Sequence, residues 1–329
     1  MCYSFSTLDW KVIDHLSKKD SFFVAGRGFG GLAIAYFLKK KHPSKKVYLF
    51  DPHPLGHSAS AAASGLLEPI GGRLAVRSPL ASEGLMLSKY LLDKVSHFLG
   101  KKVYLEGGVV HAPIDQSQES IFKKKAEDYP DWFSWTKDKE LLVREGVNVF
   151  SKTYLEGLFS LVKSMGVEFY QTSVPIDPEI KMIFLCVGAS IQEMLPDAFR
   201  LTRGQAMRVK KLETTFSLPK VCRGYVALDL DPSIYHLGST YERTNLHLPP
   251  DKTMAVKELK ERNRDIYPEI DEVEVVEMRS GVRVFCKDEK RLPRILQIAP
   301  NQVALAGFGS KGLLYHALFA KKIVDDYST

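Results

Sequence analysis

The sequence predicts an α/β fold, and three observations support this prediction. The stretch "FFVAGRGFGGLAIAYFL" (22–38) is typical of a buried strand, a glycine-rich turn and the start of a helix. A second apolar stretch, "KVYLFD", ends in Asp51. The stretch "VALAGFGSKGLLYHALFAKKIV" (303–324) repeats the order of strand, glycine loop and helix. Alternation of strands and helices at both ends of a chain is typical of an α/β protein.

The first glycine turn has the spacing of a dinucleotide site. Gly26, Gly28 and Gly31 follow the pattern G-x-G-x-x-G. Gly26 permits the tight turn, Gly28 lets a pyrophosphate approach the backbone, and Gly31 lets the helix pack closely on the strand. The helix "LAIAYFLKKK" follows, and the free N–H groups at its start would face the phosphates.

Asp51 completes this motif at the end of the second strand. It lies 20 residues beyond Gly31, where a carboxylate accepts hydrogen bonds from the hydroxyls of an adenosine ribose. NAD and FAD both fit the motif at this point. Arg27 is unusual within the turn, and we expect it either to lie over a phosphate or to point to solvent.

The composition is that of a soluble globular protein. Of 329 residues, 45% are hydrophobic and 26% are charged, and no run approaches the ~18 apolar residues of a membrane helix. The N-terminal stretch lacks the features of a secretory signal, and we expect a surface helix around residues 8–16. The four cysteines are far apart in sequence, which argues against disulfides and zinc and favours a reducing, cytoplasmic location.

Charge and histidine spacing narrow the function classes. The net charge is +7, and the lysines are scattered in small groups along the chain. Scattered charge favours a solvated surface, with an RNA-binding footprint as the alternative. The nine histidines show no metal-ligand spacing, so no metal site is predicted.

Four further stretches carry a resemblance to a known family: "HSASAAASGLLEPIGGR" (57–73), "KMIFLCVGAS" (181–190), "LTRGQAM" (201–207) and "SGVRVFCKDEKRLPRI" (280–295). In this order they resemble the D-amino-acid-oxidase-like family of FAD-dependent oxidoreductases, which includes glycine oxidase, sarcosine oxidase and a tRNA-modifying oxidase domain. Two departures stand out: Val187 replaces the usual threonine, and the spacing between Asp288 and Pro293 is looser.

The resemblance favours FAD over NAD and implies which residues bind it. The flavin would run beside the small residues Ser58, Ser64 and Gly65, and the adenine near Val174 in the expected strand "VEFYQTSV" (167–174). Gly188 would close over the cofactor. The amides that follow the last glycine loop would stabilise negative charge at the N1–C2=O edge of the reduced flavin. That set is Gly309, Ser310, Lys311, Gly312 and Leu313.

The resemblance also implies a domain division. A discontinuous, Rossmann-like FAD-binding domain would comprise residues 20–98, 143–205 and 278–329. An inserted substrate domain would comprise residues 99–142 and 206–277, whose alternating apolar residues are typical of an antiparallel sheet.

The family oxidises a C–N bond by hydride transfer to flavin N5, and the imine is then hydrolysed. Arg283 would clamp a substrate carboxylate, because a planar guanidinium pairs with it bidentately. A structural ion pair of Arg283 with Asp288 is the alternative. Tyr241 would form part of the pocket, and no separate catalytic side chain is assigned. Covalent attachment of the flavin through Cys286 is a minor alternative.

Three functions remain open on the sequence. The substrate is either a free amino acid or secondary amine, or a carboxymethylaminomethyl side chain on the wobble uridine of tRNA. "GFGSKGL" resembles the tRNA-modifying relative most. The third function is a flavin-binding module without turnover. The electron acceptor and the oligomeric state are not predicted.

Overall fold

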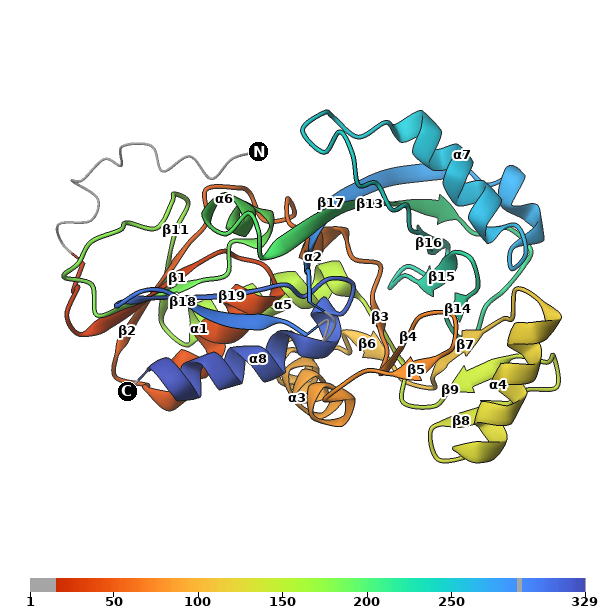
Figure 1. Cartoon of the computed structure of the whole chain (residues 1–329), viewed down its shortest axis with the longest axis horizontal. Helices are drawn as coiled ribbons and strands as arrows, with labels where there is room; N and C mark the ends of the chain where they lie inside the picture. Colours follow the sequence, from red (N-terminus) through yellow and green to blue (C-terminus); the bar gives the residue numbers. More distant parts are fainter. Residues whose placement is uncertain (1–15, 289–291, 329) are drawn as a thin grey trace.

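The computed structural model describes residues 16–288 and 292–328, so the helix expected around residues 8–16 lies almost wholly outside the described residues. A six-stranded sheet forms the centre of one half of the molecule (Figure 1). Its neighbouring strands are β11 (Val167–Tyr170), β2 (Lys46–Phe50), β1 (Ser21–Ala25), β12 (Met182–Leu185), β19 (Gln302–Ala306) and β18 (Arg294–Ala299). The first five run parallel and β18 runs antiparallel at the edge. The predicted α/β fold is confirmed.

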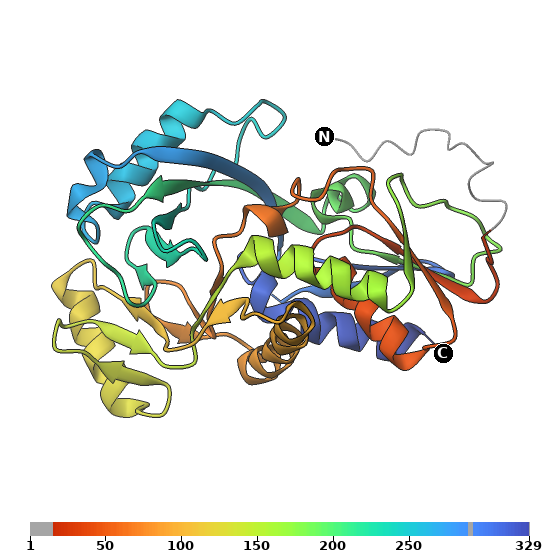
Figure 2. The ribbon, with the colours of Figure 1, turned by 180° about the vertical axis from the view of Figure 1, so that it is seen from behind.

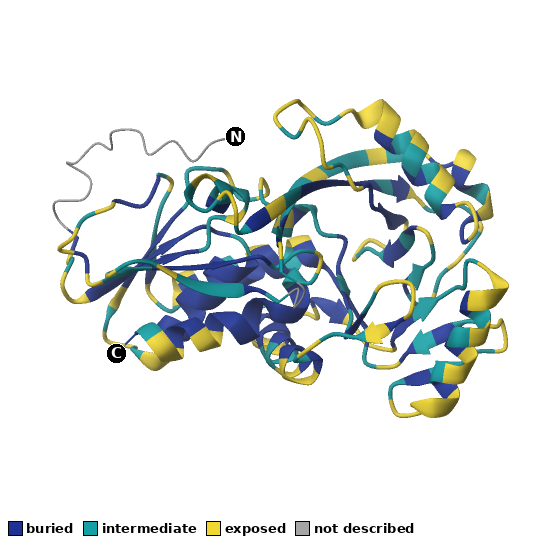
Figure 3. Cartoon of the chain, in the orientation of Figure 1, coloured by how far each residue is buried: buried dark blue, intermediate teal, exposed yellow. Residues whose placement is uncertain are grey.

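Four helices lie together on one face of this sheet, as Figures 1 and 2 show from opposite sides. They are α1 (Phe29–Lys41), α3 (Ala81–Leu99), α5 (Ser151–Ser164) and α8 (Gly312–Tyr327). Every residue of α1 from Phe29 to Leu38 is buried, and only the final lysines reach solvent. Figure 3 shows the same core as a continuous dark band through the sheet, α1 and α8. This core fixes the ends of the parallel strands, where the glycine turns lie.

The other half is built on an eight-stranded sheet, which confirms the expected antiparallel architecture. Its order is β17 (Val275–Cys286), β13 (Phe199–Lys210), β16 (Ile234–Gly238), β15 (Tyr225–Leu228), β14 (Lys220–Val221), β7 (Val109–His111), β9 (Leu141–Val143) and β8 (Phe133–Trp135). Only the β14–β7 pair is parallel. Helices α7 (Lys252–Asn263) and α4 (Gln116–Asp128) cover the outside of the sheet (Figure 1).

Short elements connect the two halves. Three strands, β3 (Leu66–Leu67), β10 (Val147–Val149) and β6 (Tyr104–Leu105), form a small sheet, and β4 (Ile70–Gly71) pairs with β5 (Val76–Arg77). The remaining helical turns are α2 (Ala59–Ala62), η2 (Gly188–Ser190), α6 (Ile191–Met194) and η3 (Pro268–Asp271). The buried Asn148 of β10 holds both the carbonyl and the N–H of Leu228, at 3.0 and 2.8 Å. The expected domain boundaries at 205/206 and 277/278 fall inside the continuous strands β13 and β17. The division into two domains therefore stays a prediction.

The strand expected over residues 167–174 ends at Tyr170. The backbone bends at Gln171 and Thr172, ahead of Pro175 and Pro178. Val174 is instead buried in the second core cluster, on the other side of the sheet's central strands.

Candidate functional site

A cavity of about 1360 Å³ lies between the two halves. It begins at the carboxyl ends of β1 and β2 and extends beneath β13 and β17 of the eight-stranded sheet. Ligands of open parallel sheets bind at this edge, where the glycine-rich turns leave the strands. The volume exceeds the ~300–1,000 Å³ of an ordinary small-molecule site. It therefore suits a long ligand together with a second, smaller one.

The glycine turn after β1 admits no side chain at Gly26 or Gly31, two of the three glycines of the motif. A Cβ on Gly26, whose φ is +100°, would lie 2.1 Å from the carbonyl oxygen of Cys186. A Cβ on Gly31 would lie 1.9 Å from the carbonyl oxygen of Gly26. Gly28 lines the cavity as the N-cap of α1 and has no capping side chain. The first turn of α1 contains no acidic residue, so its positive dipole end is free to face an anion.

Asp51 lines the cavity beside the glycine turn. Its carboxylate accepts hydrogen bonds from the backbone N–H groups of Arg27 (2.7 Å) and His53 (2.9 Å). These bonds hold the carboxylate at the end of β2 and leave it lone pairs for a ligand hydroxyl.

Arg27 does not point to solvent, which was one of its two expected orientations. Its guanidinium is buried over the ring of Phe169, 4.2 Å from the ring centroid, and donates to the carbonyl of His53 at 2.8 Å. Burial lowers the pKa of Arg27, and the nearby charge of Asp51 partly opposes this effect. Arg27 therefore closes the outer wall of the cavity rather than reaching into solvent.

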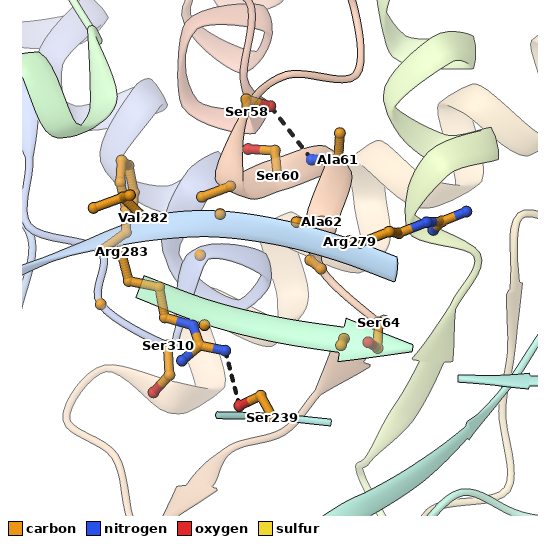
Figure 4. A pocket seen from close by; sticks show the side chains of 18 of the residues that line it. Ser58, Ser60, Ala61, Ala62, Ser64, Ser239, Arg279, Val282, Arg283 and Ser310 are labelled. Atoms are coloured by element: carbon orange, nitrogen blue, oxygen red, sulfur yellow. Dashed lines mark hydrogen bonds between the residues drawn. The ribbon is translucent and has the colours of Figure 1, made fainter. Parts of the chain in front are cut away.

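The small-residue loop passes along the middle of the cavity (Figure 4). Ser58 caps the short helix α2 by accepting from the N–H of Ala61 at 3.3 Å. Gly65 has a φ of +98°, and a Cβ there would lie 1.8 Å from the carbonyl of Val149. Ser64 accepts a hydrogen bond from the hydroxyl of Tyr225 at 2.8 Å. The loop is thus held between the two halves and brings its backbone to the ligand.

Arg283 points into the cavity from β17 (Figure 4). Its Nη2 donates to the hydroxyl of Ser239 at 2.9 Å, and the guanidinium lies 5.1 Å from the ring centroid of Tyr241. Nη1 is buried and has no hydrogen-bond partner. The alternative ion pair with Asp288 is not present, whereas Arg294 does bind Asp288. A guanidinium with a buried, unused donor at Nη1 is suited to receive a carboxylate.

Room for this guanidinium comes from Gly204 on the neighbouring strand β13. A Cβ on Gly204 would lie 2.6 Å from Nη2 of Arg283. Next to it, Arg203 and Gln205 both bind the carboxylate of Glu242, with contacts of 2.7 and 2.8 Å. Burial raises the pKa of Glu242, but these hydrogen bonds and the charge of Arg203 outweigh burial and lower it. This network fixes the chain that carries Tyr241.

The loop before α8 lies beside Arg283. The N–H of Gly309 donates to the carbonyl of Val284 at 2.7 Å. The Nζ of Lys311 donates to the carbonyls of Glu68 and Ile70. Burial lowers the pKa of Lys311, and the charge of Glu68 partly opposes this. The helix α8 has no acidic residue in its first turn, so its start also presents a positive end to the cavity.

Most of the predicted site residues line this one cavity. They are Gly26, Gly28, Asp51, Ser58, Ser64, Gly65, Gly188, Tyr241, Arg283, Gly309, Ser310, Lys311, Gly312 and Leu313. Gly31 does not line it, in keeping with its expected role in packing, and Val174 lies outside it. Cys286 also lies outside; burial raises the pKa of its thiol to about 11, and its Sγ donates to the carbonyl of Leu292 at 3.2 Å.

The structure adds site residues that the sequence prediction did not include: Glu68, His111, Tyr225 and Ser239. Glu68 stands within the quoted stretch 57–73, but nothing in the sequence links it to His111. Tyr225 on β15 and Ser239 directly after β16 lie in the region where an antiparallel sheet was expected, yet an alternating pattern does not tell which face meets a ligand.

Within residues 16–288 and 292–328, no three acidic, histidine or cysteine side chains are arranged to hold a metal ion. No helix in the same part of the chain is long and apolar enough to cross a membrane.

The comparisons with known proteins agree with this geometry. No curated protein sequence matches the chain. Among solved structures, it is similar to glycine oxidase from Bacillus cereus ATCC 14579 (17% identity, 94% of this chain and 95% of that chain covered, TM-score 0.79). It is also similar to glycine oxidase from Geobacillus kaustophilus (16%, 93% and 94%, 0.77) and to iminodiacetate oxidase from Chelativorans sp. BNC1 (15%, 93% and 95%, 0.75).

The TM-scores and the coverage of both chains establish the likeness of fold. The family itself follows from a sequence-family match, that of the FAD-dependent oxidoreductases known as DAO, which extends over residues 21–325. The chain therefore belongs to the DAO family of FAD-dependent oxidoreductases.

Proposed function

We propose that the protein binds FAD in this cavity and oxidises the C–N bond of an amino acid or secondary amine that carries a carboxylate. The single observation that carries the proposal is Arg283, whose buried Nη1 has no partner in a cavity lined by the predicted cofactor residues. A free guanidinium donor beside a flavin site calls for an anionic substrate group. The solved structures named above include two glycine oxidases and an iminodiacetate oxidase.

The residues present fit FAD. The glycine turn and the start of α1 offer N–H groups for the pyrophosphate, and Asp51 offers oxygens for the ribose. Gly65 brings the backbone close to the middle of the ligand, and the start of α8 offers a positive end for the flavin ring. The chemistry that FAD supplies is acceptance of a hydride at N5, after which water hydrolyses the imine.

The charge of the cavity supports the same assignment. Among the described residues that line it, eight are lysine or arginine and four are aspartate or glutamate. The two negative charges of a pyrophosphate and one substrate carboxylate would compensate most of this excess. A tRNA substrate, bearing a carboxymethylaminomethyl group, remains the alternative for the same clamp.

The test is the visible absorption spectrum of the purified protein, recorded anaerobically before and after addition of glycine, sarcosine or tRNA from a strain that lacks the modification. We expect a flavin spectrum that a carboxylate-bearing amine bleaches. Bleaching by tRNA alone, with a rate that falls steeply as salt rises, would establish the tRNA alternative. A flavin that none of the three reduces would contradict the enzymatic proposal and favour a binding module without turnover.

The clamp has its own test. Arg283→Met should raise the KM for a carboxylate substrate about 30-fold or more, since removing one partner of a buried charged pair costs ~2–5 kcal/mol. The KM of an amine without a carboxylate is the matched comparison and should change little. Equal KM values for the carboxylate substrate in variant and wild type would refute the clamp.

A further inference from the structure

A buried acid–histidine pair lies in the cavity and has no part in binding FAD as proposed above. Nε2 of His111 and Oε1 of Glu68 are 2.5 Å apart, and the two side chains are 14% and 11% exposed. Both residues line the cavity, His111 at the end of β7 and Glu68 just after β3. Burying a carboxylate costs free energy unless it is paired, so this position requires an explanation.

The pair determines which ring nitrogen of His111 is free, because Nε2 faces the carboxylate of Glu68. Burial raises the pKa of Glu68, but the charge and hydrogen bond of His111 and the charge of Lys311 outweigh burial and lower it. Glu68 is therefore a carboxylate, which accepts the proton of Nε2. A neutral imidazole that donates from Nε2 carries its lone pair on Nδ1. Nδ1 is then the position at which His111 can accept a proton.

The pair and Arg283 are joined through the loop before α8. Gly309 binds the carbonyl of Val284, the residue next to Arg283. Two residues further on, Nζ of Lys311 binds the backbone carbonyl of Glu68. This one loop thus touches β17 beside Arg283 and the segment that carries the acid–histidine pair, and all three segments line one cavity.

Amine oxidation requires a proton acceptor in the cavity. An amino acid arrives with its nitrogen as an ammonium, which has no lone pair to stabilise the positive charge that develops as hydride leaves the adjacent carbon. We propose that His111 accepts this proton at Nδ1. The Glu68 carboxylate orients the imidazole and stabilises the positive charge that the ring then carries. The inference rests on the proposed function, because it needs an amine substrate whose carboxylate lies at Arg283.

The step balances without a further reactant. An N–H bond of the ammonium breaks, its electron pair stays on the substrate nitrogen, and an N–H bond forms at Nδ1. The two electrons of the oxidation leave separately, with the hydride that FAD accepts. His111 becomes an imidazolium, whose charge the Glu68 carboxylate stabilises through the existing hydrogen bond.

Lys311 is a poorer acceptor in the same cluster. Its Nζ is already held by two backbone carbonyls, which leaves it less available to a substrate amine. Two charged groups face His111, namely the Glu68 carboxylate and, beyond it, the Lys311 side chain. The uncharged ring of Phe122 on α4 lies on another side, with its centroid 6.3 Å from the centroid of the His111 ring.

The test is the rate of anaerobic flavin reduction by the amine that bleaches the wild type, measured by stopped flow between pH 6 and pH 10. His111→Gln keeps a polar group near Glu68 but removes the base; at neutral pH we expect a loss of about 100-fold or more. At high pH, where the free amine is itself deprotonated, the variant should recover most of the wild-type rate. Glu68→Gln should show a smaller loss of the same form, and the exposed His97→Gln on α3 serves as the matched control.

A second measurement does not depend on turnover. Histidine NMR of the FAD-loaded protein without amine reports the protonation of His111, assigned with His111→Gln. The ring should gain its proton over the same pH interval in which flavin reduction by the wild type slows. A His111→Gln variant that binds FAD and keeps the wild-type pH profile would overturn the inference, and so would an NMR titration in a different interval. If no amine reduces the wild type, the proposed function fails and this inference fails with it.

Discussion

The substitution Gly204→Ala tests whether the position of the Arg283 guanidinium determines binding of a carboxylate, because it adds one methyl group next to that guanidinium. The added Cβ would lie 2.6 Å from Nη2, 2.7 Å from Cζ and 2.8 Å from Nη1 of Arg283, whereas ordinary contacts begin at 3.4 Å. The backbone of Gly204 is fixed by pairing with Gly281 on β17, so the guanidinium must withdraw by about 1 Å. That movement breaks the 2.9 Å hydrogen bond to Ser239 and turns the unused Nη1 away from the cavity.

We expect Gly204→Ala to fold and bind FAD, because a flexible side chain yields and alanine costs no backbone strain in a strand. The affinity for a carboxylate ligand should fall by about 10- to 100-fold, as a displacement of 1 Å in a positioning group can cost ~10²-fold. The assay is titration of the flavin spectrum with acetate or substrate in Gly204→Ala, Arg283→Met and the double variant. If Arg283 mediates the effect, Gly204→Ala adds nothing in the Arg283→Met background. Unchanged affinity, or additive losses in the double variant, would refute this reasoning.

Three other predictions follow from the same geometry. Asp51→Asn should lower FAD content and raise the dissociation constant of FAD, measured by reconstitution of the apoprotein; unchanged affinity would contradict the ribose assignment. Gly65→Ala should destabilise the fold or abolish FAD binding, since its Cβ would lie 1.8 Å from the carbonyl of Val149; a variant with normal FAD content and thermal stability would count against the close approach. His316 is buried against the hydroxyl of Tyr154, and burial lowers its pKa from 6.5 to about 4. As the pH falls from 6.5 to 4, the unfolded state therefore binds a proton that the folded state does not, and stability falls by about 3 kcal/mol. Urea unfolding at pH 7 and pH 4 should show this loss in the wild type and not in His316→Gln; equal losses would exclude His316 as the cause.

The cofactor end of the site was predictable because its determinants are local. Gly26, Gly28 and Gly31 stand within six residues, and Asp51 ends the next strand along the chain. Each of these residues is required by the backbone path of a single strand, turn and helix. Their spacing in the sequence is therefore enough to predict the turn. The antiparallel sheet was predictable in kind from alternation, but its register and the parallel β14–β7 pair depend on contacts between distant segments.

Local pattern failed where a residue's role depends on what lies opposite it. Val174 stands at the end of the expected strand, yet the backbone bends at Gln171 and Thr172 and leaves the sheet after Tyr170. Arg27 stands in the phosphate turn, yet Phe169, from a strand more than a hundred residues later, holds its guanidinium against the wall. A single sequence contains no signal that pairs these positions.

The Glu68–His111 pair could be recognised only from the three-dimensional structure. Glu68 and His111 are separated by 43 positions and by the whole of α3, and no pattern in the sequence connects them. The loop before α8, predicted for its amides, also contributes the Lys311 side chain, whose charge helps to keep Glu68 ionised. If Lys311→Met removed that charge, the Glu68 carboxyl would be easier to protonate, and His111 would lose its anionic partner at a higher pH. Flavin reduction by the Lys311→Met variant should therefore begin to slow at a higher pH than in the wild type. An unshifted pH profile would show that the lysine charge does not reach the pair.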